Sequence, residues 1–145
     1  MYFVDREKIE LTLRYIEENI VLYKENTSWD TPLEKKSLER IAVGMMEGML
    51  DVGNSMIDGF IMRDPGSYED IIDILEDEKV VTQEMAQQLK HFIRLRKNLV
   101  QEYLEINHEQ LESSLNLVME SVIAFSTHVR NYLENELGPV SAFKN

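Results

Sequence analysis

A basic side chain stands in the middle of an otherwise apolar helical row around residue 96. At steps of 3, 4, 3 and 4 the row contains Leu89, Phe92, Arg96, Leu99 and Tyr103. This spacing puts all five on one face of a helix. Burial of a guanidinium is costly unless an anion pairs with it. Arg96 is therefore expected to face a partner carboxylate, a cleft or a subunit interface, and a side chain that snorkels to solvent is the alternative.

Three more basic residues surround Arg96 and complete the one dense basic cluster of the chain. They are Lys90, Arg94 and Lys97. The chain has 145 residues, of which 27 are acidic and 15 basic, so its net charge is −12. Such an acidic molecule repels nucleic acid in general, and the cluster is its natural site for a phosphate. Ordinary solvated helix charges are the alternative interpretation.

An acidic stripe on an earlier segment could complement this cluster. At steps of 4, 3 and 4 the stripe contains Glu47, Asp51, Asn54 and Asp58. Asp51 is expected to pair with Arg96 if the two helices pack together, and a solvated stripe is the alternative. Gly44 and Gly48 lie on a nearby face and would allow another helix to approach closely.

Other common site chemistries find no support in the sequence. Cysteine is absent, which excludes disulfides, a thiolate nucleophile and Cys-ligated zinc. The one Glu-x-x-His pattern, Glu105 to His108, straddles an expected helix break, so no metal site is expected. There is no Gly-rich phosphate loop and no Gly-x-Ser-x-Gly elbow, and no cofactor is expected.

The elements that position these residues are helical throughout. Apolar residues recur at helical spacing in five segments, expected at about 5–24, 31–60, 68–78, 82–104 and 107–137. The expected N-caps are Asp5, Thr31, Ser67, Thr82 and Asn107. Gly138 is expected to close the last helix as a left-handed C-cap, and Pro139 is expected to block its continuation. The dense acidic face of the short segment at 68–78 is interpreted as solvated.

The expected fold is one all-α domain over residues 1–145, an antiparallel up-and-down bundle of four long helices and one short helix. A short tail follows at 138–145, in which Phe143 could dock on the bundle. No apolar run approaches the roughly 20 residues of a membrane helix, and the N-terminus does not resemble a signal peptide. A cytoplasmic location is expected.

Three stretches of the chain resemble the HepT-like HEPN domains. They are Val4–Ile9, Leu38–Ile41 followed by Leu50–Asn54, and Pro65–Asp70 leading through Val80 and Val81 to Arg96–Tyr103. The resemblance covers roughly residues 4–133. It implies a HEPN-like helical bundle that forms a homodimer. It also implies a metal-independent endoribonuclease that acts as a toxin beside a small nucleotidyltransferase antitoxin.

The resemblance assigns roles to the residues around Arg96. The family motif is Arg, four residues, His, one residue, Tyr; Arg96 and Tyr103 match it, and Gln101 takes the place of the His. The implied catalytic set is Arg96, Gln101 and Tyr103, and Tyr103 is the position that the antitoxin modifies with AMP. The implied phosphate contacts are Arg94, Lys97 and Asn98, and the residues expected to line a groove on the second helix are Asp51 and Asn54.

Helix geometry adds a constraint on this motif. Positions five apart differ by about 140° around an ideal helix, so Arg96 and Gln101 do not share a face. Positions seven apart do, so the hydroxyl of Tyr103 is expected at the same groove as Arg96. A tyrosine whose hydroxyl is spent on a backbone carbonyl in the core is the alternative.

The replacement of the motif His by Gln101 leaves three interpretations of the function. General acid–base catalysis is worth ~10²–10⁴-fold, and a carboxamide cannot exchange a proton near pH 7. The first interpretation is therefore a weakened or inactive ribonuclease that works as a homodimeric RNA-binding or regulatory module. The alternative is an active toxin in which Glu102, Tyr103 or His108 replaces the His. The third is a purely structural partner of a nucleotidyltransferase.

Overall fold

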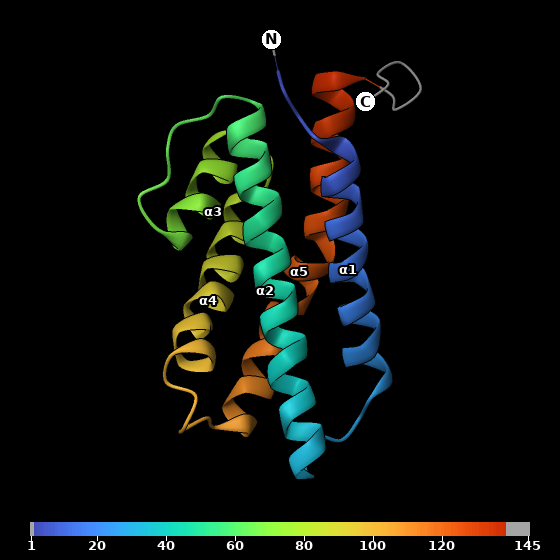
Figure 1. Ribbon diagram of the computed structural model, residues 1–145, viewed down its shortest axis with the longest axis vertical. Coiled ribbons are helices and arrows are strands. Elements are labelled where there is room, and N and C mark those ends of the chain that lie inside the picture. Colours follow the sequence, from blue (N-terminus) through green and yellow to red (C-terminus); the bar gives the residue numbers. More distant parts are fainter. Residues whose placement is uncertain (1, 139–145) are drawn as a thin grey trace.

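Five helices and no strand make up residues 2–138, the part of the chain that the computed structural model describes. They are α1 (Arg6–Glu25), α2 (Pro32–Gly59), α3 (Tyr68–Asp77), α4 (Gln83–Val100) and α5 (His108–Leu137). The four long helices run up and down in alternation, and α3 is a short helix beside α2 and α4 (Figure 1). The all-α prediction is confirmed. The expected docking of Phe143 lies outside the described residues.

Local capping chemistry starts each helix at the predicted residue. Asp5, Thr31, Ser67, Thr82 and Asn107 are the N-caps. Each side-chain oxygen accepts a hydrogen bond from the backbone N–H three residues later, a donor with no partner inside the helix. None of the described helices is long and apolar enough to cross a membrane.

The predicted apolar faces of the helices meet in one core. The fully buried side chains of the long helices include Leu13, Met45, Phe92 and Phe125. Helices α1 and α2 approach each other closely at the two glycines singled out from the sequence. A Cβ atom on Gly48 would lie 2.6 Å from Cγ1 of Ile16, and one on Gly44 would lie 2.9 Å from the hydroxyl of Tyr15. The prediction of a close helix approach at this face is thus confirmed, and the approaching helix is α1.

Helix α4 is shorter than predicted. It ends at Val100, whereas the apolar spacing indicated about Leu104. The side-chain amide of Asn98 donates hydrogen bonds to the backbone carbonyls of Glu102 and Glu105, at 3.2 and 3.0 Å. Asn side chains offer the backbone such an alternative to helical bonding. The chain therefore leaves the helix after Val100 and forms a loop over residues 101–107.

The end of α5 agrees with the predicted glycine. Gly138 has φ 83°, a backbone conformation that favours glycine, and its N–H donates to the carbonyl of Glu134. Its ψ of −179° lies outside the left-handed helical region that the prediction named. The carbonyl of Gly138 accepts a hydrogen bond from Arg6 at 2.8 Å, which ties the end of α5 to the start of α1.

Candidate functional site

Arg96 has a carboxylate partner, as its place in an apolar row predicts, but the partner is not the predicted one. Its Nε atom lies 2.5 Å from Oε1 of Glu47 on α2. The prediction that Asp51 would pair with Arg96 is wrong: Asp51 is exposed, and Glu47, one turn earlier on α2, faces α4. The Arg96 side chain is 20% exposed, and its hydrogen bond to Glu47 raises the pKa of the guanidinium above its usual value.

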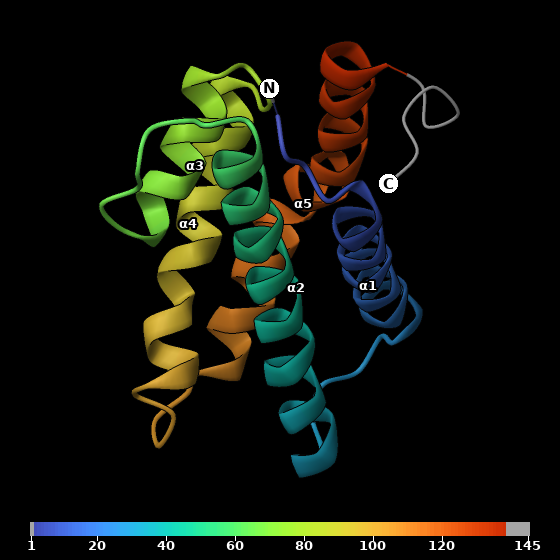
Figure 2. The same ribbon diagram turned by 45° about the horizontal axis from the view of Figure 1, so that its top comes forward.

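A third helix contributes an aromatic ring to this pair. Tyr68 is the first residue of α3, and its ring centroid lies 4.5 Å from Cζ of Arg96, a cation–π contact. Figure 2 shows α3 beside α4, and the ring of its first residue contacts a guanidinium 28 positions later in the sequence. Tyr68 remains 50% exposed. Sequence reasoning missed this residue because no periodicity links α3 to α4.

The acidic face of α3, interpreted from the sequence as solvated, also pairs with the basic cluster of α4. Asp73 lies 2.8 Å from Nζ of Lys90, and Glu69 lies 2.9 Å from Nη2 of Arg94. Both pairs are partly exposed, so they neutralise charge without adding much stability. Lys97 is exposed, and no ion pair to it occurs within residues 2–138.

The loop after α4 carries the rest of the predicted motif. Gln101 is the C-cap of α4, and its side chain is exposed. Tyr103 is 61% exposed and lies beyond the helix, so the expectation that it continues the α4 face of Arg96 is wrong. The core alternative for this tyrosine is also excluded. The amide nitrogen of Asn98, a predicted phosphate contact, is committed to holding this loop.

The imidazole closest in sequence to Gln101 is engaged elsewhere. Nε2 of His108, the first residue of α5, lies 2.7 Å from Oε2 of Glu39 on α2, and both side chains are largely buried. This pair anchors the far end of the 101–107 loop to α2. Within residues 2–138, no three acidic or histidine side chains are grouped as a metal site would require.

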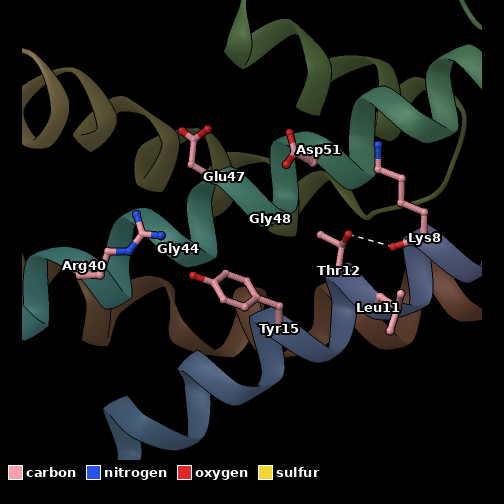
Figure 3. Close-up of a pocket in the computed structure, with 9 residues that line it drawn as sticks. All are labelled: Lys8, Leu11, Thr12, Tyr15, Arg40, Gly44, Glu47, Gly48 and Asp51. Carbon is pink, nitrogen blue, oxygen red and sulfur yellow. Dashed lines mark hydrogen bonds between the residues drawn. The ribbon is translucent and has the colours of Figure 1, made fainter.

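A groove runs along the surface between α1 and α2 (Figure 3). Its lining residues are Lys8, Leu11, Thr12, Tyr15, Arg40, Gly44, Glu47, Gly48 and Asp51. Tyr15 reaches from α1 toward α2 in this view. Asp51 lines this groove, whereas Asn54 and Arg96 are not among its lining residues. Glu47 belongs both to this groove and to the pair with Arg96.

The geometry can bind an anion but offers little for proton transfer. The guanidiniums of Arg94 and Arg96 are both partly exposed and held by carboxylates, and the half-exposed ring of Tyr68 packs on that of Arg96. Guanidinium groups match phosphate oxygens well. Gln101 cannot act as a general acid or base.

Comparison with known proteins finds one family model and one close relative that each match most of the chain. The family model described as "Ribonuclease HepT-like" matches residues 9–130. A Bacillus subtilis (strain 168) protein named "Putative RNase YutE" is 50% identical over 144 residues, which are 99% of this chain and 100% of that protein.

Solved structures agree in fold. A structure of YutE from Bacillus subtilis, described as a cytosolic protein of unknown function, has a TM-score of 0.95 at 50% identity, over 99% of this chain and 100% of that one. A tri-AMPylated HEPN toxin of Shewanella oneidensis, in complex with an MNT antitoxin, has a TM-score of 0.75 at 19% identity, over 85% of this chain and 96% of that one. This second likeness is one of fold.

Proposed function

The chain belongs to the HepT-like ribonuclease family, and from this premise we propose that it is a weakened or inactive ribonuclease that binds RNA as a cytoplasmic homodimer. The observation that carries the proposal is Gln101, a carboxamide where the family motif has an imidazole. Cleavage by attack of a ribose 2′-hydroxyl on its phosphate needs a group that moves protons near pH 7. A carboxamide holds a hydrogen bond and does no more.

The part of the motif that binds phosphate is present. Arg96 supports this function because its guanidinium is partly exposed and can donate hydrogen bonds to a phosphate in place of Glu47. Lys97, next to it, adds an exposed positive charge. The retained cations and the missing imidazole together favour RNA binding without efficient cleavage, which suits a regulatory role.

Restoring the imidazole tests the proposal directly. Fluorescently labelled RNA is incubated with metal-free protein in chelator and resolved on a denaturing gel. Wild type should cleave weakly or not at all, and Gln101→His should increase the rate by ~10²-fold or more. Gln87→His is the matched control, since Gln87 is exposed on the same helix about 21 Å away and should change nothing. Strong cleavage by wild type that Arg96→Ala abolishes would instead establish an active toxin.

We infer that the partner of this domain is a nucleotidyltransferase that adds AMP to Tyr103. Its 61% exposure supports this, because a transferase must reach the hydroxyl. The tri-AMPylated HEPN toxin bound to an MNT antitoxin gives a precedent of the same fold. An adenylyl group there would place an anion in the loop that follows Arg96, which should weaken RNA binding.

Mass spectrometry after co-expression with a neighbouring nucleotidyltransferase tests the modification. The AMP adduct should map to Tyr103, disappear in Tyr103→Phe, and persist in Tyr15→Phe, which removes the hydroxyl of a half-exposed tyrosine on α1. An unmodified Tyr103 in the presence of an active, bound transferase would exclude this mechanism.

A further inference from the structure

Helix α3, which carries no residue of the Arg–His–Tyr motif, supplies the aromatic group at Arg96. The ring of Tyr68 packs on the guanidinium at 4.5 Å and is still 50% exposed. Unpaired nucleotides are bound by this combination of groups: a planar side chain stacks on the base while a cation holds the phosphate.

The neighbouring residue on α3 brings in a second guanidinium. Glu69 follows Tyr68 in the chain and holds Arg94 at 2.9 Å, while Glu47 holds Arg96 from the other side. The side chains of the Arg94 pair are 58% and 40% exposed, so both groups are largely solvated. Pairs this exposed contribute little to stability. A phosphate can therefore take the place of Glu69 without unfolding the helices, and at the less exposed Arg96 pair it can approach from the side of Glu47, whose side chain is 42% exposed.

We propose that Tyr68, Arg94 and Arg96 form a nucleotide subsite for RNA, in which Tyr68 stacks on a base while the two guanidiniums exchange Glu69 and Glu47 for its phosphates. The proposal rests on the proposed RNA-binding function and extends the site from α4 to α3. The ring lies directly on one guanidinium, and the residue next to it pairs with the other, so base and phosphate contacts come from one surface.

Charge explains why the carboxylates belong to the site. With a net charge of −12, the molecule repels a polyanion, so phosphate binding is confined to places where cations gather, and at Arg94 and Arg96 the phosphate must displace an acid that already holds the cation. Glu47 and Glu69 compete with RNA for the two arginines. Removing either acid should therefore strengthen RNA binding. The gain should exceed that from removing one negative charge at another position of the surface.

The stacking contact is tested by fluorescence anisotropy with two labelled probes, a 12-nucleotide single-stranded oligouridine RNA and a ribose-phosphate chain of equal length without bases. Tyr68→Ala should weaken binding of the oligouridine by about tenfold, a typical loss for one stacked base. Tyr68→Phe should bind like wild type, and Tyr68→Leu, which keeps the apolar bulk, should bind like Tyr68→Ala. Binding of the baseless chain should be the same in all four proteins.

Matched controls separate the subsite from general effects. Tyr2→Ala removes another half-exposed tyrosine, one that packs on Phe60, and should not alter RNA binding. Glu47→Gln should tighten binding about two- to tenfold at low salt, whereas Asp58→Asn, the same charge change at an exposed position of α2, should alter it less than twofold.

Each result has a definite meaning. Circular dichroism first verifies that every variant keeps the helical fold. If Tyr68→Ala and Tyr68→Leu bind oligouridine like wild type while Arg96→Ala does not bind, the subsite is refuted and the proposed function stands. If wild type does not bind RNA, or if Arg96→Ala binds it equally well, both the subsite and the proposed function are refuted.

Discussion

One amide side chain divides the motif residues between a helix and a loop. Asn98 donates to the carbonyls of Glu102 and Glu105, and this ends α4 before Gln101. Arg96 therefore stays on the packed helix, while Gln101 and Tyr103 lie on an exposed turn. At the scale of single residues, the amide of Asn98 is therefore architectural, and its hydrogen bonds to the loop occupy the group that the resemblance assigns to phosphate.

Replacing this amide should loosen the loop and leave the bundle intact. Asn98→Ala removes two side-chain hydrogen bonds, which together contribute ~1–3 kcal/mol. Hydrogen exchange of the amides at 101–105 should become faster, while exchange in the core of α2 stays slow. Asn131→Ala, an exposed amide on α5, is the control and should leave the exchange of this loop unchanged. Unaltered exchange at 101–105 in Asn98→Ala would show that the loop is held by other contacts.

At the scale of elements, α1 is held against its neighbours by two different means. Toward α2 the contact is steric, because the glycines of α2 leave room for Ile16 and Tyr15. Toward α5 it is electrostatic, because Arg130 contacts Glu10 and Glu17 at 2.8–2.9 Å. The first contact depends on shape and the second on pH.

The steric contact predicts a position-dependent effect of a single methyl group. Gly48→Ala would place Cβ 2.6 Å from Cγ1 of Ile16, and overpacking of this kind typically costs ~1–3 kcal/mol. Gly66→Ala is the control, since its Cβ would meet nothing closer than Oδ2 of Asp70 at 3.6 Å. Urea unfolding should show a lower free energy of unfolding for Gly48→Ala than for Gly66→Ala. Equal stabilities would mean that α1 shifts to accommodate the methyl group.

The electrostatic contact predicts a dependence on acid. Hydrogen bonds from Arg130 lower the pKa of Glu10 and of Glu17 below the ordinary 4.5. Carboxyls with a lowered folded-state pKa stabilise the fold above pH 4.5, and this stability is lost as pH falls through the folded pKa values. Arg130→Met should thus be less stable at pH 7 and should lose less stability than wild type between pH 5 and pH 3.

Urea titrations across this range provide the measurement. Arg14→Met is the control: Arg14 pairs with a single acid, Glu10, within the described part of the chain and is 65% exposed, so its removal should change the pH dependence less. Parallel pH curves for wild type and Arg130→Met would contradict the assignment of the two carboxyls to Arg130.

At the scale of the whole molecule, the acidic charge and the exposed apolar residues have opposite effects on self-association. The apolar side chains left exposed include Leu11, Leu22 and Leu104. Such residues, together with the family resemblance, favour a homodimer in which Arg96 of both chains lies near a shared groove. High net charge limits association to surfaces where apolar contact outweighs repulsion.

Light scattering at micromolar concentration tests the assembly. The expected mass is twice the 17.0 kDa of one chain. Leu104→Glu, in the loop that follows Arg96, should shift the protein toward monomer, because Leu104 is 88% exposed and would meet the partner there. Leu33→Glu, at the exposed start of α2, should not. A mass of 17.0 kDa for wild type would refute the dimer.

Local signals in the sequence were enough for the helices themselves. Caps such as Thr31 and Asn107 act within three residues, and an apolar face repeats every three or four. The starts of the helices were therefore predicted correctly, and so were their buried faces, apart from Tyr103 beyond the end of α4. The presence of Arg96 in a buried row also predicted a partner carboxylate, a cleft or a subunit interface opposite it, since the cost of an unpaired charge does not depend on the fold, and the structure has the carboxylate.

Tertiary structure decided which side chains meet. Glu47 and Asp51 are equally good partners for Arg96 by type and spacing, and only the axial offset of α2 against α4 selects Glu47. Tyr68 joins the site because a short helix returns to a residue 28 positions away. The hydrogen bonds of Asn98 overrode an apolar repeat that extended to Tyr103. Helical periodicity defines a face but not its register against a neighbour, which arises from packing between segments distant in the chain. It also does not define where the helix ends, which at α4 is set by side-chain hydrogen bonds to the loop that follows.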